Sequence, residues 1–124
     1  IYDKNIVGSG DTFLVDCLLD SWDIHGFASK FNEKMKIDLM EYCGKLKNKN
    51  PVIDYIPVEI THLWHGNLKN RKYMDRHDVI KKYDYDPKSD IVLRNDVYEW
   101  STEKPQMQED IRQYFFERKE DSEI

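Results

Sequence analysis

The stretch VIDYIPVEITHLW, residues 52–64, decides how the fold is interpreted, because its composition is that of a β-strand. β-Branched and aromatic residues are enriched in strands, and they follow one another closely here. Pro57 places part of the strand at a sheet edge or at a bend. One strand cannot make a sheet, so we expect its partner strands to lie upstream of residue 1.

On both sides of this strand, apolar residues at helical spacing predict four helices. These helices span about residues 11–22, 29–46, 73–83 and 106–120. The last is amphipathic and has four residues expected to face inward, namely Met107, Ile111, Tyr114 and Phe115. A hairpin-like turn is predicted at Asn95 and Asp96. The predicted fold class is therefore α+β and mostly helical.

Length and charge bound the class of protein. The chain has 124 residues, the size of one domain or part of one, and we treat 1–124 as a single segment. Its first residues already look like the middle of a domain, so we expect a fragment. The net charge is −5, with 19 basic and 24 acidic residues interspersed. Nucleic-acid-binding proteins usually carry a clear basic excess, and this chain has none. We therefore expect no nucleic-acid partner.

Two further features concern the compartment. No stretch approaches the ~20 apolar residues that a membrane span needs. Cys17 and Cys43 both lie in predicted helices among apolar residues. We expect two buried thiols in a reducing compartment rather than a disulfide. The predicted location is the cytoplasm.

The turn Gly8-Ser9-Gly10-Asp11 joins an extended segment to the first predicted helix. Its glycines permit positive φ and a close approach of other groups to the backbone. Asp11 has two interpretations: a helix N-cap, or a general base held by a rigid turn. The turn lacks the third glycine and the Lys-Ser/Thr ending of phosphate-binding loops.

Two histidines, His62 and His65, lie at the end of the predicted strand. Alternate strand residues share a face, so the two should not chelate one ion unless the backbone turns between them. His65 is the better candidate metal ligand, because Gly66 indicates a turning, exposed backbone. The alternative is a hydrogen-bonded structural imidazole. Trp64 is either a wall for a sugar ring or a buried core residue.

A basic turn follows directly, with Lys69, Arg71 and Lys72, and it continues to Arg76. Several cations beside a candidate metal ligand suit a diphosphate leaving group. The alternative is a solvated helix start whose charges are balanced by nearby aspartates.

The order of these motifs resembles the C-terminal half of glycosyltransferases with the GT-A fold. The glycine-acid loop at residues 8–11 is similar to the family's acceptor-side loop, and His65 is similar to its late metal-binding histidine. The string HLWHGNLKNRKYMDRH, followed by YDYDP, also resembles a set of bacterial and phage glycosyltransferases. The family commonly has Glu-Asp where this loop has one acid. No Asp-x-Asp metal motif precedes the histidine in this sequence. Asp84-Tyr85-Asp86 has that spelling, but it follows the histidine and precedes a proline, so we do not assign it to the metal.

The resemblance implies the C-terminal portion of a GT-A type α/β fold, without its nucleotide-binding half and inactive alone. It implies transfer of a sugar from a nucleotide-diphosphate sugar donor to a glycan or other hydroxyl acceptor. Asp11 would be the catalytic base, and His65 would bind manganese or magnesium. The substrate-binding residues would be Gly8, Gly10, Trp64, Lys69 and Arg71. The alternative function is a non-catalytic interaction module of a larger viral or bacterial protein.

Overall fold

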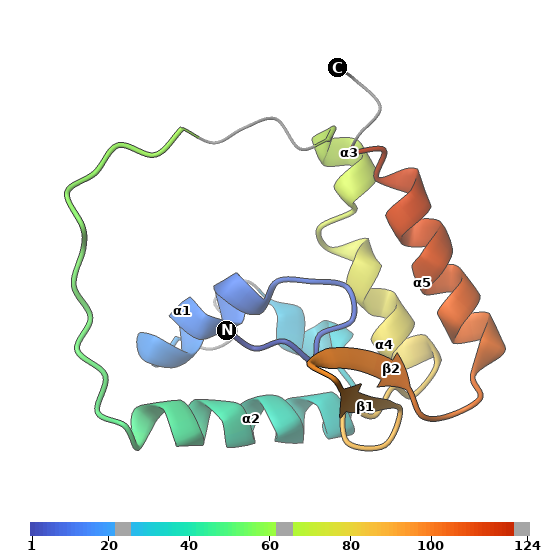
Figure 1. The fold of residues 1–124 in the computed structure, drawn as a ribbon, viewed down its shortest axis with the longest axis horizontal. Coiled ribbons are helices and arrows are strands. Elements are labelled where there is room, and N and C mark those ends of the chain that lie inside the picture. The colour runs from blue at the N-terminus through green and yellow to red at the C-terminus, as the bar shows by residue number, and fades with distance from the viewer. Residues whose placement is uncertain (22–25, 62–65, 121–124) are drawn as a thin grey trace.

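The computed structural model describes residues 1–21, 26–61 and 66–120 (Figure 1). The helices within these residues are α1 (Gly10–Leu18), α2 (Glu33–Lys47), α3 (Leu68–Arg71), α4 (Asp78–Lys82) and α5 (Pro105–Glu117). Short 3₁₀ helices at Phe27–Lys30 and Asp75–His77 precede α2 and α4. The strands are β1 (Ile91–Arg94) and β2 (Val97–Trp100). The coarse prediction of an α+β chain with more helix than strand is confirmed.

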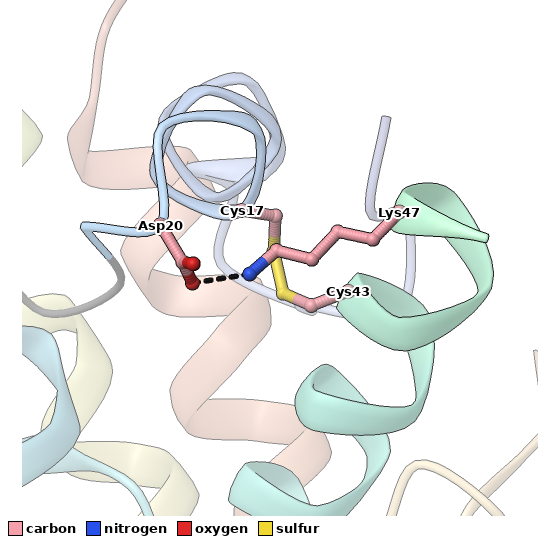
Figure 2. Close-up of a disulfide and its surroundings, with 4 residues drawn as sticks. All are labelled: Cys17, Asp20, Cys43 and Lys47. Carbon is pink, nitrogen blue, oxygen red and sulfur yellow. Dashed lines mark hydrogen bonds and ion pairs between the residues drawn. A yellow bond between two sulfur atoms is a disulfide. The ribbon is translucent and has the colours of Figure 1, made fainter. Parts of the chain in front are cut away.

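Helix α1 packs beside α2, and a disulfide joins them (Figures 1 and 2). Cys17 in the last turn of α1 is bonded to Cys43 in α2, with 5.2 Å between their Cα atoms. Lys47 and Asp20 form an ion pair beside the bridge. The prediction of two free thiols is therefore wrong. Packing of the two helices brings the Cα atoms within the range a disulfide spans, and the sequence does not encode that distance.

Helix α2 begins later than predicted, because Asn32 caps it. The side-chain oxygen of Asn32 accepts a hydrogen bond from the Met35 amide at 2.9 Å. The side-chain amide of Asn32 donates to the carbonyl oxygen of Tyr85 at 2.8 Å, which ties the start of α2 to the chain after α4. The residues before Asn32 form a separate 3₁₀ turn.

The second half of the described chain is built around a β-hairpin. Strands β1 and β2 are antiparallel, and Arg94 pairs with Val97 across the turn. Asn95 and Asp96 both have positive φ, 48° and 62°, as the tight two-residue turns of hairpins require. The predicted turn at these residues is confirmed. Helices α4 and α5 run beside each other next to the hairpin (Figure 1).

One core connects these elements. Its buried apolar residues are Tyr2, Val7, Phe13, Cys17, Phe31, Met35, Leu39, Ile80, Tyr85, Ile91, Met107, Ile111 and Tyr114. Three of the four residues expected to face inward from α5 are among them. The fourth, Phe115, is exposed, so that part of the prediction is wrong. Phe115 lies one residue beyond Tyr114, which turns its side chain toward the edge of the buried face.

The predicted strand at residues 52–64 is not formed in residues 52–61, and residues 62–65 lie outside the described part of the chain. The described segment runs as an irregular, exposed stretch away from the helices (Figure 1). A strand needs a partner to bond its backbone, and among the described residues no other segment pairs with this one. The segment expected to be a polar turn after it contains the short helix α3.

Candidate functional site

The Gly8-Ser9-Gly10 turn is a tight left-handed turn that starts α1. Gly8 has φ 93° and Ser9 has φ 73°. The amide of Gly8 donates to the carbonyl oxygen of Asn5 at 3.0 Å, which closes the turn. Gly10 is the first residue of α1, and a side chain there would collide with the carbonyl group of Tyr2. The sequence therefore identified this turn correctly, and the two glycines serve different purposes.

Asp11 lies in the first turn of α1 and is exposed. The N-cap position belongs to Ser9, whose side chain makes no capping hydrogen bond. The interpretation of Asp11 as the cap is therefore wrong. A carboxylate in the first turn still interacts favourably with the helix dipole. Its exposure leaves it accessible to a ligand.

Arg76 holds the turn from the other side. Its Nη2 atom donates to the hydroxyl oxygen of Ser9, and its guanidinium group lies close to Gly8. Its Nη1 atom donates to the hydroxyl oxygen of Tyr114 at 3.3 Å. Its Cζ atom lies 4.9 Å from the centre of the Tyr73 ring, within cation–π range. Arg76 thus joins the turn at residues 8–10 to α5.

Of the two cations assigned to a diphosphate, Lys69 is exposed on α3 and Arg71 is not. The Arg71 side chain is 13% exposed. Its Nη1 atom donates to the hydroxyl oxygen of Tyr73 at 2.7 Å, and its Nη2 atom lies 3.3 Å from Glu120. Arg71 and Arg76 contact the same tyrosine ring. The predicted basic turn and the glycine turn are therefore brought to one region.

A further arginine, Arg118, completes this region. Its side chain is 14% exposed, and it shares Oε1 of Glu120 with Arg71. Its guanidinium group lies 5.7 Å from the Tyr114 ring centre. We call Arg71, Arg76 and Arg118, with Tyr73 and Tyr114, the arginine cluster. The sequence pattern predicted no role for Arg118, and it identified Arg76 only as the end of the basic turn.

His65 and Trp64, the predicted metal ligand and sugar wall, lie outside the described residues, as does His62. Gly66, which follows them, is described. A side chain on Gly66 would lie 3.1 Å from the carbonyl oxygen of Arg118. The chain that leads out of the histidine segment therefore starts beside the arginine cluster. No group of three possible metal ligands occurs within the described ranges.

A pocket of about 280 Å³ lies between α4 and α5, next to the arginine cluster. Its lining includes Lys72, Arg76 and Tyr114, together with the carboxylates Asp75, Asp110 and Glu117. Asp110 is paired with Lys82 at 2.7 Å, and Glu117 with Lys72 at 2.5 Å. No hydrogen bond or ion pair joins Asp11 to the cluster among the described residues. Within the part of the chain that the structure describes, the hydrogen bond from Arg76 to Ser9 links the glycine turn to the cluster.

Comparison of the chain with known protein families, curated proteins and solved structures gave no match, so function is argued from residues and geometry. Within the described ranges, each helix is too short or too polar to cross a bilayer.

Proposed function

We propose that this chain is the acceptor-side, C-terminal part of a GT-A type glycosyltransferase that uses a divalent metal. The observation that carries the proposal is the position of Asp11. A left-handed turn at Gly8 and Ser9 leads into α1, and Asp11 is exposed in the first helical turn. A rigid turn that presents a carboxylate at a helix start is what a positioned general base requires.

In the proposed reaction the acceptor hydroxyl oxygen forms a bond to the anomeric carbon of the donor sugar. Asp11 takes the proton from that hydroxyl as the bond forms. The bond between the anomeric carbon and the diphosphate oxygen breaks, and the nucleoside diphosphate leaves. Lys69 and Arg71 were expected to offset the charge on this leaving group. Since Arg71 is largely covered, Lys69 is the more accessible of the two.

The proposal includes manganese or magnesium, with His65 as one ligand. The described residues contain no group of three ligands, so they do not fit a complete metal site by themselves. Its other ligands would belong to a nucleotide-binding half outside residues 1–124, and we route no step of the reaction through the ion. Trp64 would contact the sugar, and the acceptor would be a glycan or another hydroxyl compound.

The proposal places the protein in the cytoplasm. Stable disulfides are rare in that compartment, so the Cys17–Cys43 disulfide of the structure is evidence against this part of the proposal. Counting free thiols after rapid alkylation of protein in intact cells checks this part. A fully oxidised pair would contradict a cytoplasmic location.

The test uses the full-length gene product with a panel of nucleotide-diphosphate sugars and manganese, measuring release of nucleoside diphosphate. Asp11→Asn should lower turnover by at least ~100-fold without unfolding the protein. Asp20→Asn is the matched control, because Asp20 is also an exposed aspartate near α1 and its ion pair in the described structure is with Lys47. No donor cleavage with any sugar, or equal activity of Asp11→Asn and wild type, would refute the proposal.

A second candidate function is a non-catalytic interaction module. It is favoured by the exposed apolar side chains of the segment 52–60, which include Val52 at 94% and Ile60 at 81%. Contiguous exposed apolar residues commonly mark a surface that another part of a protein covers. The same exposure is expected of a glycosyltransferase fragment whose partner strands are elsewhere. Reading the full-length gene discriminates, since only the enzyme requires an upstream nucleotide-binding half with Asp-x-Asp.

A further inference from the structure

We propose that the arginine cluster is a binding site for a phosphate-class anion, with a diphosphate as the best-fitting ligand. The anion is assigned to Arg76 and Lys72, which line a pocket, and Arg71 and Arg118 add positive charge behind them. Assigning the diphosphate to a nucleotide rests on the proposed function. The anion site itself rests only on the geometry of these residues.

The first reason is charge. The cations Arg71, Lys72, Arg76 and Arg118 contact only two carboxylates among the described residues, Glu117 and Glu120. Arg71 and Arg118 share one oxygen atom of Glu120. Arg76 has neutral partners, namely the hydroxyl groups of Ser9 and Tyr114. Four cations therefore face two paired carboxylates. Asp75 lines the neighbouring pocket and lowers this excess of positive charge, but it does not pair with Arg76 in the described structure.

The second reason is that these arginines have hydrogen-bond donors without acceptors in the described structure. The Nε atoms of Arg71, Arg76 and Arg118 are all buried and make no hydrogen bond within the described structure. Buried donors without acceptors are unfavourable by about 1–3 kcal/mol each, more when charged. A phosphate group carries several acceptor oxygens and pairs with a guanidinium group through two parallel hydrogen bonds. Of the three, Arg76 lines the pocket, and a small rotation of its side chain toward such an anion would satisfy a donor that the folded chain leaves unused.

The third reason is that the cluster is held in place by aromatic rings. Arg71 and Arg76 lie 5.3 and 4.9 Å from the Tyr73 ring centre. Tyr114 accepts from Arg76 and donates to the carbonyl oxygen of Arg71, both at 3.3 Å. These contacts fix the directions of flexible side chains before a ligand arrives. Preorganisation of this kind lowers the entropy lost on binding.

Access comes from the pocket of about 280 Å³ between α4 and α5, where Lys72 and Arg76 reach the surface. The carboxylates Asp110 and Glu117 on its wall are neutralised by Lys82 and Lys72. We therefore place the anion at Arg76 and Lys72. Arg71 and Arg118 contribute from behind through the positive potential of the cluster.

The test is thermal unfolding and calorimetric titration of the 124-residue chain with sodium pyrophosphate. Sodium chloride at equal ionic strength is the reference, because screening alone also changes stability. We expect pyrophosphate to raise Tm by several degrees, as a ligand that binds only the folded state does. Inorganic phosphate should bind more weakly than pyrophosphate. No stabilisation by either ion beyond that of chloride would overturn the proposal.

Three variants assign the site. Arg76→Gln and Lys72→Gln should each weaken pyrophosphate binding by about 10-fold, the loss of one charge-assisted contact. Arg112→Gln is the matched control and should bind as wild type, since Arg112 is exposed on α5 and its ion pair among residues 1–21, 26–61 and 66–120 is with Glu109. Because Arg76 also holds the glycine turn, its variant is compared by circular dichroism, and the half-exposed Lys72 gives the second test. Equal binding by Lys72→Gln and Arg112→Gln would place the anion elsewhere.

A nucleoside diphosphate forms the last arm of the titration. Tighter binding than pyrophosphate would indicate that the site also contacts a nucleoside and would support the nucleotide assignment. Equal affinity would leave the site a phosphate site and overturn only that assignment. Failure of the full-length protein to cleave donor sugars would not change either measurement, so this proposal and the proposed function fail separately.

Discussion

Gly10 lies against the carbonyl group of Tyr2, with no room between them for a side chain. This close approach brings the N-terminal segment onto the start of α1, next to the turn at Gly8 and Ser9. The first residue of the helix is therefore restricted to glycine by packing and not by its own φ angle, since Gly10 is not among the residues with positive φ. Asp11 follows directly, so its placement depends on this contact.

Gly10→Ala should destabilise the protein by about 2 kcal/mol or more, because the backbone of residues 1–2 has to move. Gly44→Ala is the matched control. Gly44 lies inside α2 with open space around it, so alanine should stabilise the helix by about 0.5–1 kcal/mol. Chemical denaturation of both variants measures the two opposite changes. A neutral Gly10→Ala would show that the Tyr2 contact is loose in solution.

The disulfide between Cys17 and Cys43 should contribute about 2–4 kcal/mol, since it closes a loop between residues 26 apart. Cys17→Ser with Cys43→Ser should therefore lower the Tm of the purified, oxidised protein by several degrees. A reducing agent should lower the Tm of the wild type and leave that of the double variant unchanged. An equal Tm for wild type with and without reductant would mean that the bond is absent or does not stabilise the fold.

We expect substitution of the buried residue Asp90 to lower the stability of the fold strongly. Its side chain is 1% exposed and lies 2.7 Å from the Nζ atom of Lys104. It also accepts from the Thr102 hydroxyl and from the Asp86 amide. Burial raises the pKa of Asp90, but Lys104 and these donors outweigh it and hold the pKa below its ordinary value.

Asp90→Ala should destabilise the protein by about 3 kcal/mol, because it leaves Lys104 and the buried donors unpaired. Asp96→Ala is the control, because it makes the same aspartate-to-alanine change at an exposed position of the hairpin turn. The positive φ of Asp96 makes alanine slightly unfavourable there. Urea unfolding of both variants gives the comparison. If the two variants lose the same free energy, the buried network contributes little.

His77 should make stability depend on pH. The side chain is fully buried, and burial, with the nearby charge of Arg76, lowers its pKa from 6.5 to about 4. In the unfolded chain His77 binds a proton near pH 6.5, whereas in the folded chain it stays neutral until about pH 4. The stabilisation is therefore complete above pH 6.5 and is lost as the pH falls toward 4, up to about 3 kcal/mol.

His77→Phe should remove this dependence, because phenylalanine keeps an aromatic ring beside Phe31 without a titrating group. The measurement is the free energy of unfolding between pH 7 and 5, a range above the ordinary pKa values of carboxylates. We expect the wild type to lose stability over this range and the variant to change little. Parallel curves for the two proteins would assign the pH dependence to other groups.

Local chemistry alone predicted several elements correctly. The spacing of Met107, Ile111 and Tyr114 predicted α5, and Asn95 with Asp96 predicted the hairpin turn. The two glycines around Ser9 predicted the turn before α1. Each of these elements is formed by residues within a few positions of one another, so a local sequence pattern is enough to predict it.

The remaining features depend on contacts between distant residues. Residues 52–61 have strand composition, but a strand is formed only where a second strand bonds its backbone. The Cys17–Cys43 bond depends on how α1 packs on α2. Arg76 and Ser9 are 67 positions apart, and Arg71 is 49 positions from Glu120. The sequence by itself determined the longer helices, the hairpin turn, the glycine turn and the residue types available to a site. Only the tertiary structure decided which cations share a carboxylate, because that follows from packing distances that no local pattern encodes.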